Sequence, residues 1–254
     1  MANDRPPSVS PLAVVAHALL LLRGRLRALV AVGVAVSLPA HAIVDGIGLR
    51  QLTSSYTPTV DVGEAAVVSL VDLLVVGPLV TAACIRVVVR EPARERPGLA
   101  AALAFAFELF PRAVLVLTLA TVGIFCGLLL FVVPGLYLAV RWALVLPVVA
   151  LEDVNPLAAL RRSGELVRGA FWRCAFVVAA GSLFASVAAF AIGSPFAAVA
   201  RSTDAAAWLV VGQGLSSAVA LPTVAVFATV LYFDRRSGGQ PLAAVDRGSG
   251  ARDD

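Results

Sequence analysis

The sequence contains no lysine and little charge of either sign. All 20 basic residues are arginines, and charged side chains make up 14% of the 254 residues, against about a quarter in a typical soluble domain. Without lysine the chain has neither the phosphate-binding loop of P-loop ATPases nor a Schiff-base lysine. A hydrophobic fraction of 60% excludes a disordered chain. Despite the net charge of +4, the composition also excludes a nucleic-acid-binding protein.

Signature motifs of several enzyme and scaffold classes are also missing. There is no His-Glu-x-x-His zinc motif and no Gly-x-Ser-x-Gly nucleophile motif. The three cysteines, Cys84, Cys126 and Cys174, have no paired spacing, so we interpret them as packing residues rather than a disulfide framework. These absences disfavour an enzyme, and we expect no metal and no other cofactor.

What the chain does contain is long apolar runs, which raise its mean hydropathy to +0.93. The runs are about 20 residues long and lack a period of two, which favours membrane-spanning helices over a barrel. We therefore predict an all-α, polytopic membrane bundle of six helices within residues 10–236, between disordered cytoplasmic tails at 1–9 and 237–254. The predicted spans are Ala28–Ile47, Ala65–Ile85, Ala113–Val133, Leu136–Leu151, Trp172–Ile192 and Ala207–Tyr232.

The arginines are distributed very unevenly around these spans. Seventeen of the 20 lie in the N-terminal segment, the second and fourth connections and the C-terminal tail. Only Arg50 and Arg201 fall on the opposite side, and Arg141 lies within a span. Because arginine-rich connections stay on the cytoplasmic side, we predict a multi-pass protein of the cell membrane with both termini in the cytoplasm.

A threefold pattern underlies the predicted spans. Three segments that contain a proline near their start each precede a pair of spans and lead to an arginine at the mouth of the next span. The segments start at Ser10-Pro11, Arg96-Pro97 and Asn155-Pro156, the arginines are Arg25, Arg112 and Arg173, and the second span of each pair contains Pro78, Pro147 or Pro222. We interpret this as three repeats of an interfacial amphipathic helix and a helical hairpin, although proline is common enough in membrane helices for chance to explain it.

The segment 155–170 is the most clearly amphipathic of the three. Leu157, Leu160 and Val167 can share one stripe, which is typical of a helix lying in the membrane interface. Its polar face is predicted to hold Arg161, Arg162, Glu165 and Arg168. The three arginines of this face and Arg173, which follows the segment, are candidates for contact with anionic lipid head groups. The alternative is that they only fix the topology.

Ionisable residues inside the spans are functional candidates because burying charge in a membrane is costly. Counted from the outer ends of their spans, Asp72 and Arg141 lie about 12 Å and about 9 Å deep, so we predict that they pair. The pair is either a structural salt bridge or a site for a head group or a proton. His41 and Asp45 share a face of the first span and could join this cluster. With no identifiable third ligand, they are a weak metal signal.

A distinctive set of residues runs from the fourth span into the fifth. These residues are Pro134–Trp142, Pro147, Glu152, Asn155-Pro156, Ala159–Ser163 and Gly169–Arg173. The set resembles the membrane domain associated with glycerophosphoryl diester phosphodiesterases and the related bacterial six-span inner-membrane proteins of unknown function. Leu231–Arg236 fits the same pattern. The resemblance covers residues 10–237 and is specific at 134–173.

The resemblance implies a six-span fold but no particular activity. In fused family members a separate catalytic domain follows the membrane domain. Here the 20 residues after Asp234 contain no histidine and no carboxylate cluster that could hold a metal, so we do not expect phosphodiesterase activity from this chain.

The function that we expect from the sequence is therefore non-catalytic. The leading hypothesis is an integral protein of the bacterial cytoplasmic membrane with a structural or accessory role in the envelope, in contact with anionic lipids or with a membrane or cytoplasmic protein partner. The alternative is a small transporter or lipid-handling permease that uses the Asp72/Arg141 layer. A third hypothesis is an intramembrane enzyme with Asp72 or His41 as its acid or base.

Overall fold

The computed structural model describes residues 10–47, 69–89, 98–152, 154–205 and 207–237, and within these ranges it contains helices and no strand. Six helical segments are long and apolar enough to cross a membrane. They are Pro11–Ile43, Ser69–Val89, Leu99–Leu130, Val132–Glu152, Phe171–Thr203 and Ala207–Arg236. Each overlaps one of the predicted spans, which confirms the all-α, six-span prediction. Of the predicted tails at 1–9 and 237–254, all residues but Ser237 lie outside the described ranges.

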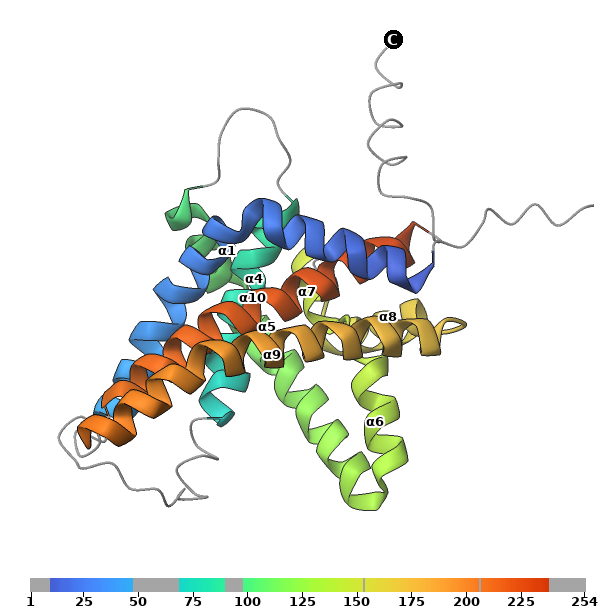
Figure 1. Ribbon diagram of the computed structural model, residues 1–254. Helices are drawn as coiled ribbons and strands as arrows, with labels where there is room; N and C mark the ends of the chain where they lie inside the picture. Colours follow the sequence, from blue (N-terminus) through green and yellow to red (C-terminus); the bar gives the residue numbers. More distant parts are fainter. Residues whose placement is uncertain (1–9, 48–68, 90–97, 153, 206, 238–254) are drawn as a thin grey trace, which may run out of the picture.

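The last helix is the most buried of the spans, and two other long helices flank it. Helices α1 (Pro11–Ile47), α9 (Phe171–Thr203) and α10 (Ala207–Arg236) run side by side along much of their length (Figure 1). Small residues bring them close together: Gly181 of α9 packs against the ring of Phe227, and Gly33 of α1 packs against the backbone of Ala218. Such close approaches are typical of helix pairs in membranes, where packing replaces the hydrophobic driving force.

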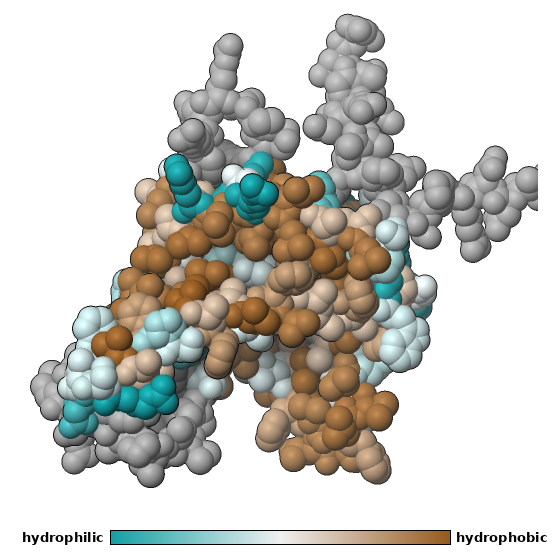
Figure 2. Space-filling model, in the orientation of Figure 1, coloured by the Kyte–Doolittle hydropathy of each residue, from teal (hydrophilic) through white to brown (hydrophobic). Residues whose placement is uncertain are grey.

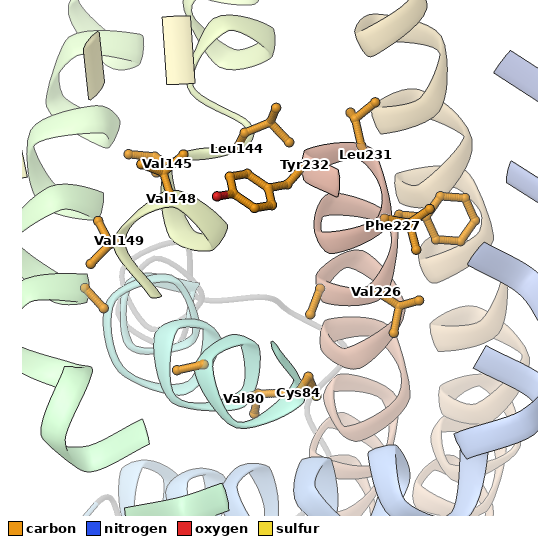
Figure 3. Close-up of a cluster of buried hydrophobic side chains, with 14 of the residues drawn as sticks. Val80, Cys84, Leu144, Val145, Val148, Val149, Val226, Phe227, Leu231 and Tyr232 are labelled. Atoms are coloured by element: carbon orange, nitrogen blue, oxygen red, sulfur yellow. The ribbon is translucent and has the colours of Figure 1, made fainter. Parts of the chain in front are cut away.

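The core lies where α10 meets α4 (Gly77–Val89) and α7 (Val145–Glu152) (Figure 3). Val80 and Cys84 of α4, Val148 of α7, and Phe227 and Tyr232 of α10 are all buried there. Helix α7 is the second half of the fourth span, so this span ends inside the bundle rather than on its lipid-facing surface.

The three prolines of the predicted pattern have three different local effects. Before Pro78 the chain forms a π-helical turn, η1 (Asp72–Val76), in which the Gly77 N–H donates to the carbonyl of Asp72. Before Pro147 the fourth span breaks into α6 (Val132–Arg141) and α7, with turns at 142–144. Pro222 leaves α10 unbroken. Proline has no N–H and crowds the preceding turn of a helix. The three helices accommodate this in three ways: a π-helical turn, a break and a continuous helix.

An apolar hairpin projects from the bundle. It consists of α6 and the second half of α5 (Leu99–Leu130), and Figure 2 shows it as an almost entirely hydrophobic arm. Residues 113–140 include no charged side chain. The large side chains at its tip are strongly exposed: Leu129, Leu130, Phe131, Val132 and Val133. Exposed apolar surface of this extent is normal only against lipid or another protein.

The structure separates only one of the three predicted interfacial helices from its span. The first is part of α1, which starts at Pro11 with the Ala13 N–H donating to Ser10 Oγ (3.3 Å), and the second is part of α5. The third is α8 (Pro156–Val167), a helix of its own. Its buried face differs from the predicted stripe, because Leu157 is 67% exposed while Ala159 and Gly164 are buried. The threefold repeat stays a prediction.

Candidate functional site

A polar cluster joins three spans around Asp72. The His41 Nε2 atom of α1 lies 3.4 Å from Asp72 Oδ1, and Ser217 Oγ of α10 lies 3.5 Å from Asp72 Oδ2. His41 is buried, and its Nδ1 lies 2.8 Å from the carbonyl oxygen of Ser37. A carbonyl oxygen only accepts, so Nδ1 carries a hydrogen. The other ring nitrogen, Nε2, is the one that faces the Asp72 carboxylate.

The π-helical turn places Asp72 in this cluster. A Cβ added to Gly77 would lie 2.9 Å from the carbonyl oxygen of Asp72, so glycine permits the tight turn. Such turns are rare and occur often at functional positions. Of the predicted intramembrane candidates, His41 and Asp72 are thus brought together. Asp45 is on α1, one helical turn beyond His41, and its side chain lies outside the described residues.

Arg141 is not part of this cluster, and the predicted pairing of Asp72 with Arg141 is wrong. At the end of α6, Arg141 Nη1 donates to the Tyr137 hydroxyl (2.8 Å), and Ser163 Oγ of α8 donates to the Arg141 carbonyl (2.9 Å). The predicted pairing required the fourth span to start level with the Asp72 end of the second span. Instead, α6 belongs to the hairpin that projects from the bundle, and its last residues pack against α8.

A second polar region lies at the end of the bundle that holds α8, the start of α9 and the last turn of α10, which we call the arginine-rich end. Here Arg173 Nη2 lies 2.7 Å from Asp234 Oδ1, and the two side chains are only 14% and 5% exposed. Arg235 Nε donates to the Leu166 carbonyl (2.8 Å). Arg173, a predicted lipid-contacting residue, is therefore occupied in holding α9 to α10.

Glu152 organises the other side of this end. Arg162 Nε donates to Glu152 Oε2 (3.1 Å), and the Tyr232 hydroxyl donates to Oε1 (2.8 Å). Arg162 Nη1 also lies 3.5 Å from Glu165. The negative charge of Glu152 raises the pKa of the Arg162 guanidinium above its usual value. Arg162, like Arg173, thus has partners within the protein.

Arg161 and Arg168 behave differently from these two. Both are exposed on α8 or at its end, and neither makes an ion pair or side-chain hydrogen bond with any residue that the structure describes. Of the four predicted lipid-contacting arginines, these two keep their charge available. Within the described ranges, no three metal-ligating side chains gather.

Sequence reasoning missed the serine and tyrosine partners. Tyr137 and Tyr232 lie within the sets of residues that carry the family resemblance, whereas Ser217 belongs to no motif. A buried hydroxyl in a span needs a partner, which singles out Ser217 and Tyr232 as polar-contact residues but does not identify the acid or base that each one contacts.

Comparison with known proteins agrees with this architecture. Residues 114–231 match the family model of the membrane domain of glycerophosphoryl diester phosphodiesterase. This stretch extends from the apolar hairpin through α8 into the last third of α10, and the match confirms the resemblance at the level of the family model. No curated protein and no solved structure matches the chain. The match and the six spans together identify a multi-pass integral membrane protein.

Proposed function

We propose that this protein is a non-catalytic, accessory component of the cell membrane that works through direct contact with lipid. The observation that carries the proposal is the apolar hairpin of α5 and α6, whose tip is exposed on every side chain from Leu129 to Val133. A turn without a polar group is best solvated by acyl chains, because water would leave this apolar area uncompensated.

The arginine-rich end supports the same proposal. We place this end at the cytoplasmic surface, with both termini in the cytoplasm, because arginine excess marks that side. The exposed Arg161 and Arg168 of α8 can then reach the head groups of the same leaflet. The permease alternative depended on an Asp72/Arg141 layer, and these two residues contact different partners.

Tryptophan quenching by lipids with brominated acyl chains tests the lipid contact. The natural tryptophans Trp142, Trp172 and Trp208 would be replaced by phenylalanine, and Phe131→Trp would report from the hairpin tip. We expect strong quenching in vesicles, with buried Phe227→Trp as the unquenched control. A tip that stays unquenched would show that protein covers the hairpin, which would contradict the proposal.

The absence of catalysis needs a separate measurement. The family model is named for a phosphodiesterase, so the purified chain would be incubated with glycerophosphodiesters with and without divalent cations. We expect no release of glycerol phosphate above the rate of a denatured sample. Turnover that survives repurification would overturn the non-catalytic part of the proposal.

A further inference from the structure

We propose that Arg141, Arg161 and Arg168 form one binding site for the phosphate head group of an anionic membrane phospholipid, whose acyl chain lies along α6. This inference rests on the proposed lipid contact and deepens it. It joins Arg141, which the sequence placed beside Asp72, to two arginines that the sequence predicted as head-group contacts.

Gly164 brings the three arginines together. On α8, Arg161 precedes Gly164 by three residues and Arg168 follows it by four, so all three positions share one face. The Arg141 side chain crosses from α6 onto this face. A Cβ on Gly164 would lie 2.8 Å from Arg141 Nε and 3.1 Å from its Cζ and Nη2. The absence of a side chain at Gly164 therefore makes room for the third cation.

The three positive charges have no acidic partner among the described residues. Of the acids near them in the chain, Asp153 lies outside the described residues, and Glu152 and Glu165 are both engaged by Arg162. Glu165 follows Arg161 by four residues, but the ion pair that it makes is with Arg162. Like charges that share a helix face repel one another, so the arrangement favours a bound anion. Arginine suits phosphate because its planar N–H groups match the phosphate oxygens in pairs.

The surface beside the arginines indicates that the anion belongs to a lipid. Arg141, Tyr137 and Val133 follow one another at four-residue intervals on α6, so they form a strip that leads from the guanidinium to the hairpin tip. Tyr137 is 45% and Val133 78% exposed. A soluble anion would gain nothing from this strip, whereas an acyl chain would bury it.

Native mass spectrometry of the purified full chain provides the test. The protein would be titrated with dioleoylphosphatidylglycerol and, separately, with dioleoylphosphatidylcholine. We expect at least tenfold tighter binding of the anionic lipid, and a loss of about fivefold for each of Arg141→Gln, Arg161→Gln and Arg168→Gln, from about 1 kcal/mol per arginine near the surface.

Two further variants separate a defined site from general attraction. Arg162→Gln removes the same charge from the same helix, but Arg162 is already paired, so the loss of lipid binding should be clearly smaller than for the three arginines of the site. Gly164→Ala keeps every charge and displaces only the Arg141 side chain, so it should weaken anionic lipid binding by about the same factor as Arg141→Gln. Circular dichroism would confirm that each variant is folded.

Three results would overturn the inference. The first is equal binding of both lipids by the wild type, and the second is a loss in Arg162→Gln as large as in the other variants. The third is displacement of the lipid by millimolar inorganic phosphate, which would indicate a site for a soluble anion. A quenched hairpin tip combined with any of these would refute the arginine site alone, whereas an unquenched tip would refute the lipid contact on which it rests.

Discussion

The contact between Gly33 of α1 and Ala218 of α10 gives the sharpest prediction for stability. Pro222 has no N–H to donate to the Ala218 carbonyl four residues earlier, and this carbonyl lies directly against Gly33. A Cβ added at Gly33 would come within 2.8 Å of the carbonyl carbon and 2.9 Å of Cα of Ala218. The obstacle is backbone, which cannot rotate away as a side chain can.

We therefore expect Gly33→Ala to destabilise the contact between α1 and α10. Forcing a methyl group into a packed interface costs about 1–3 kcal/mol, and more where the surroundings cannot relax. Replacing glycine by alanine within a helix stabilises it by about 1 kcal/mol, which partly hides this loss. A reference variant is needed to separate the two effects.

Gly24→Ala on the same helix is that reference. A Cβ at Gly24 meets nothing within 4 Å, so this variant should show only the gain in helix propensity. The difference in unfolding free energy between the two variants should be about 1–3 kcal/mol or larger, measured by unfolding in mixed micelles with increasing SDS. If Gly33→Ala gains as much stability as Gly24→Ala, the close backbone approach is absent.

Three other substitutions address the remaining contacts. Gly77→Ala should destabilise the protein by about 1–3 kcal/mol, because its methyl group would press on the carbonyl that begins the π-helical turn; an unchanged SDS midpoint would argue against that turn. Arg173→Leu and Asp234→Leu should each destabilise by about 3–5 kcal/mol, and the double variant should lose less than their sum; additive losses in this cycle would mean no pairing. Tyr232→Phe should destabilise by about 1.5–3 kcal/mol, and the loss should become smaller in a Glu152→Ala background, which removes the acceptor, if their hydrogen bond is its cause.

The spans could be predicted from the sequence because each depends on a local property. A run of about 20 apolar residues is helical wherever it sits in a membrane, and no tertiary contact is needed to recognise it. The proximity of His41 to Asp72 could also be predicted, since His41 lies near the end of the first span and Asp72 near the start of the second.

The partner of Arg141 could not be predicted in the same way. Counting 1.5 Å per residue gives a depth only when the level at which the helix starts is known. The fourth span starts in a hairpin that projects from the bundle, so a count from its start does not place Arg141 level with Asp72. The effect of a proline depends on its neighbours: Gly77 lets the second span form a π-helical turn, while α10 passes Pro222 without a break. These are tertiary adjustments that no local pattern records.

The uncharged hairpin of α5 and α6 has a consequence for the biogenesis of the protein. Placing one arginine or aspartate at the centre of a membrane helix costs about 2.5–3.5 kcal/mol in translocon-mediated insertion. The turn between α9 and α10 carries Arg201 and Asp204, so in the proposed orientation the last two spans carry charge across the membrane as they insert. Residues 113–140 carry none. In the same orientation, the turn between the third and fourth spans therefore inserts without moving a charged side chain into the membrane.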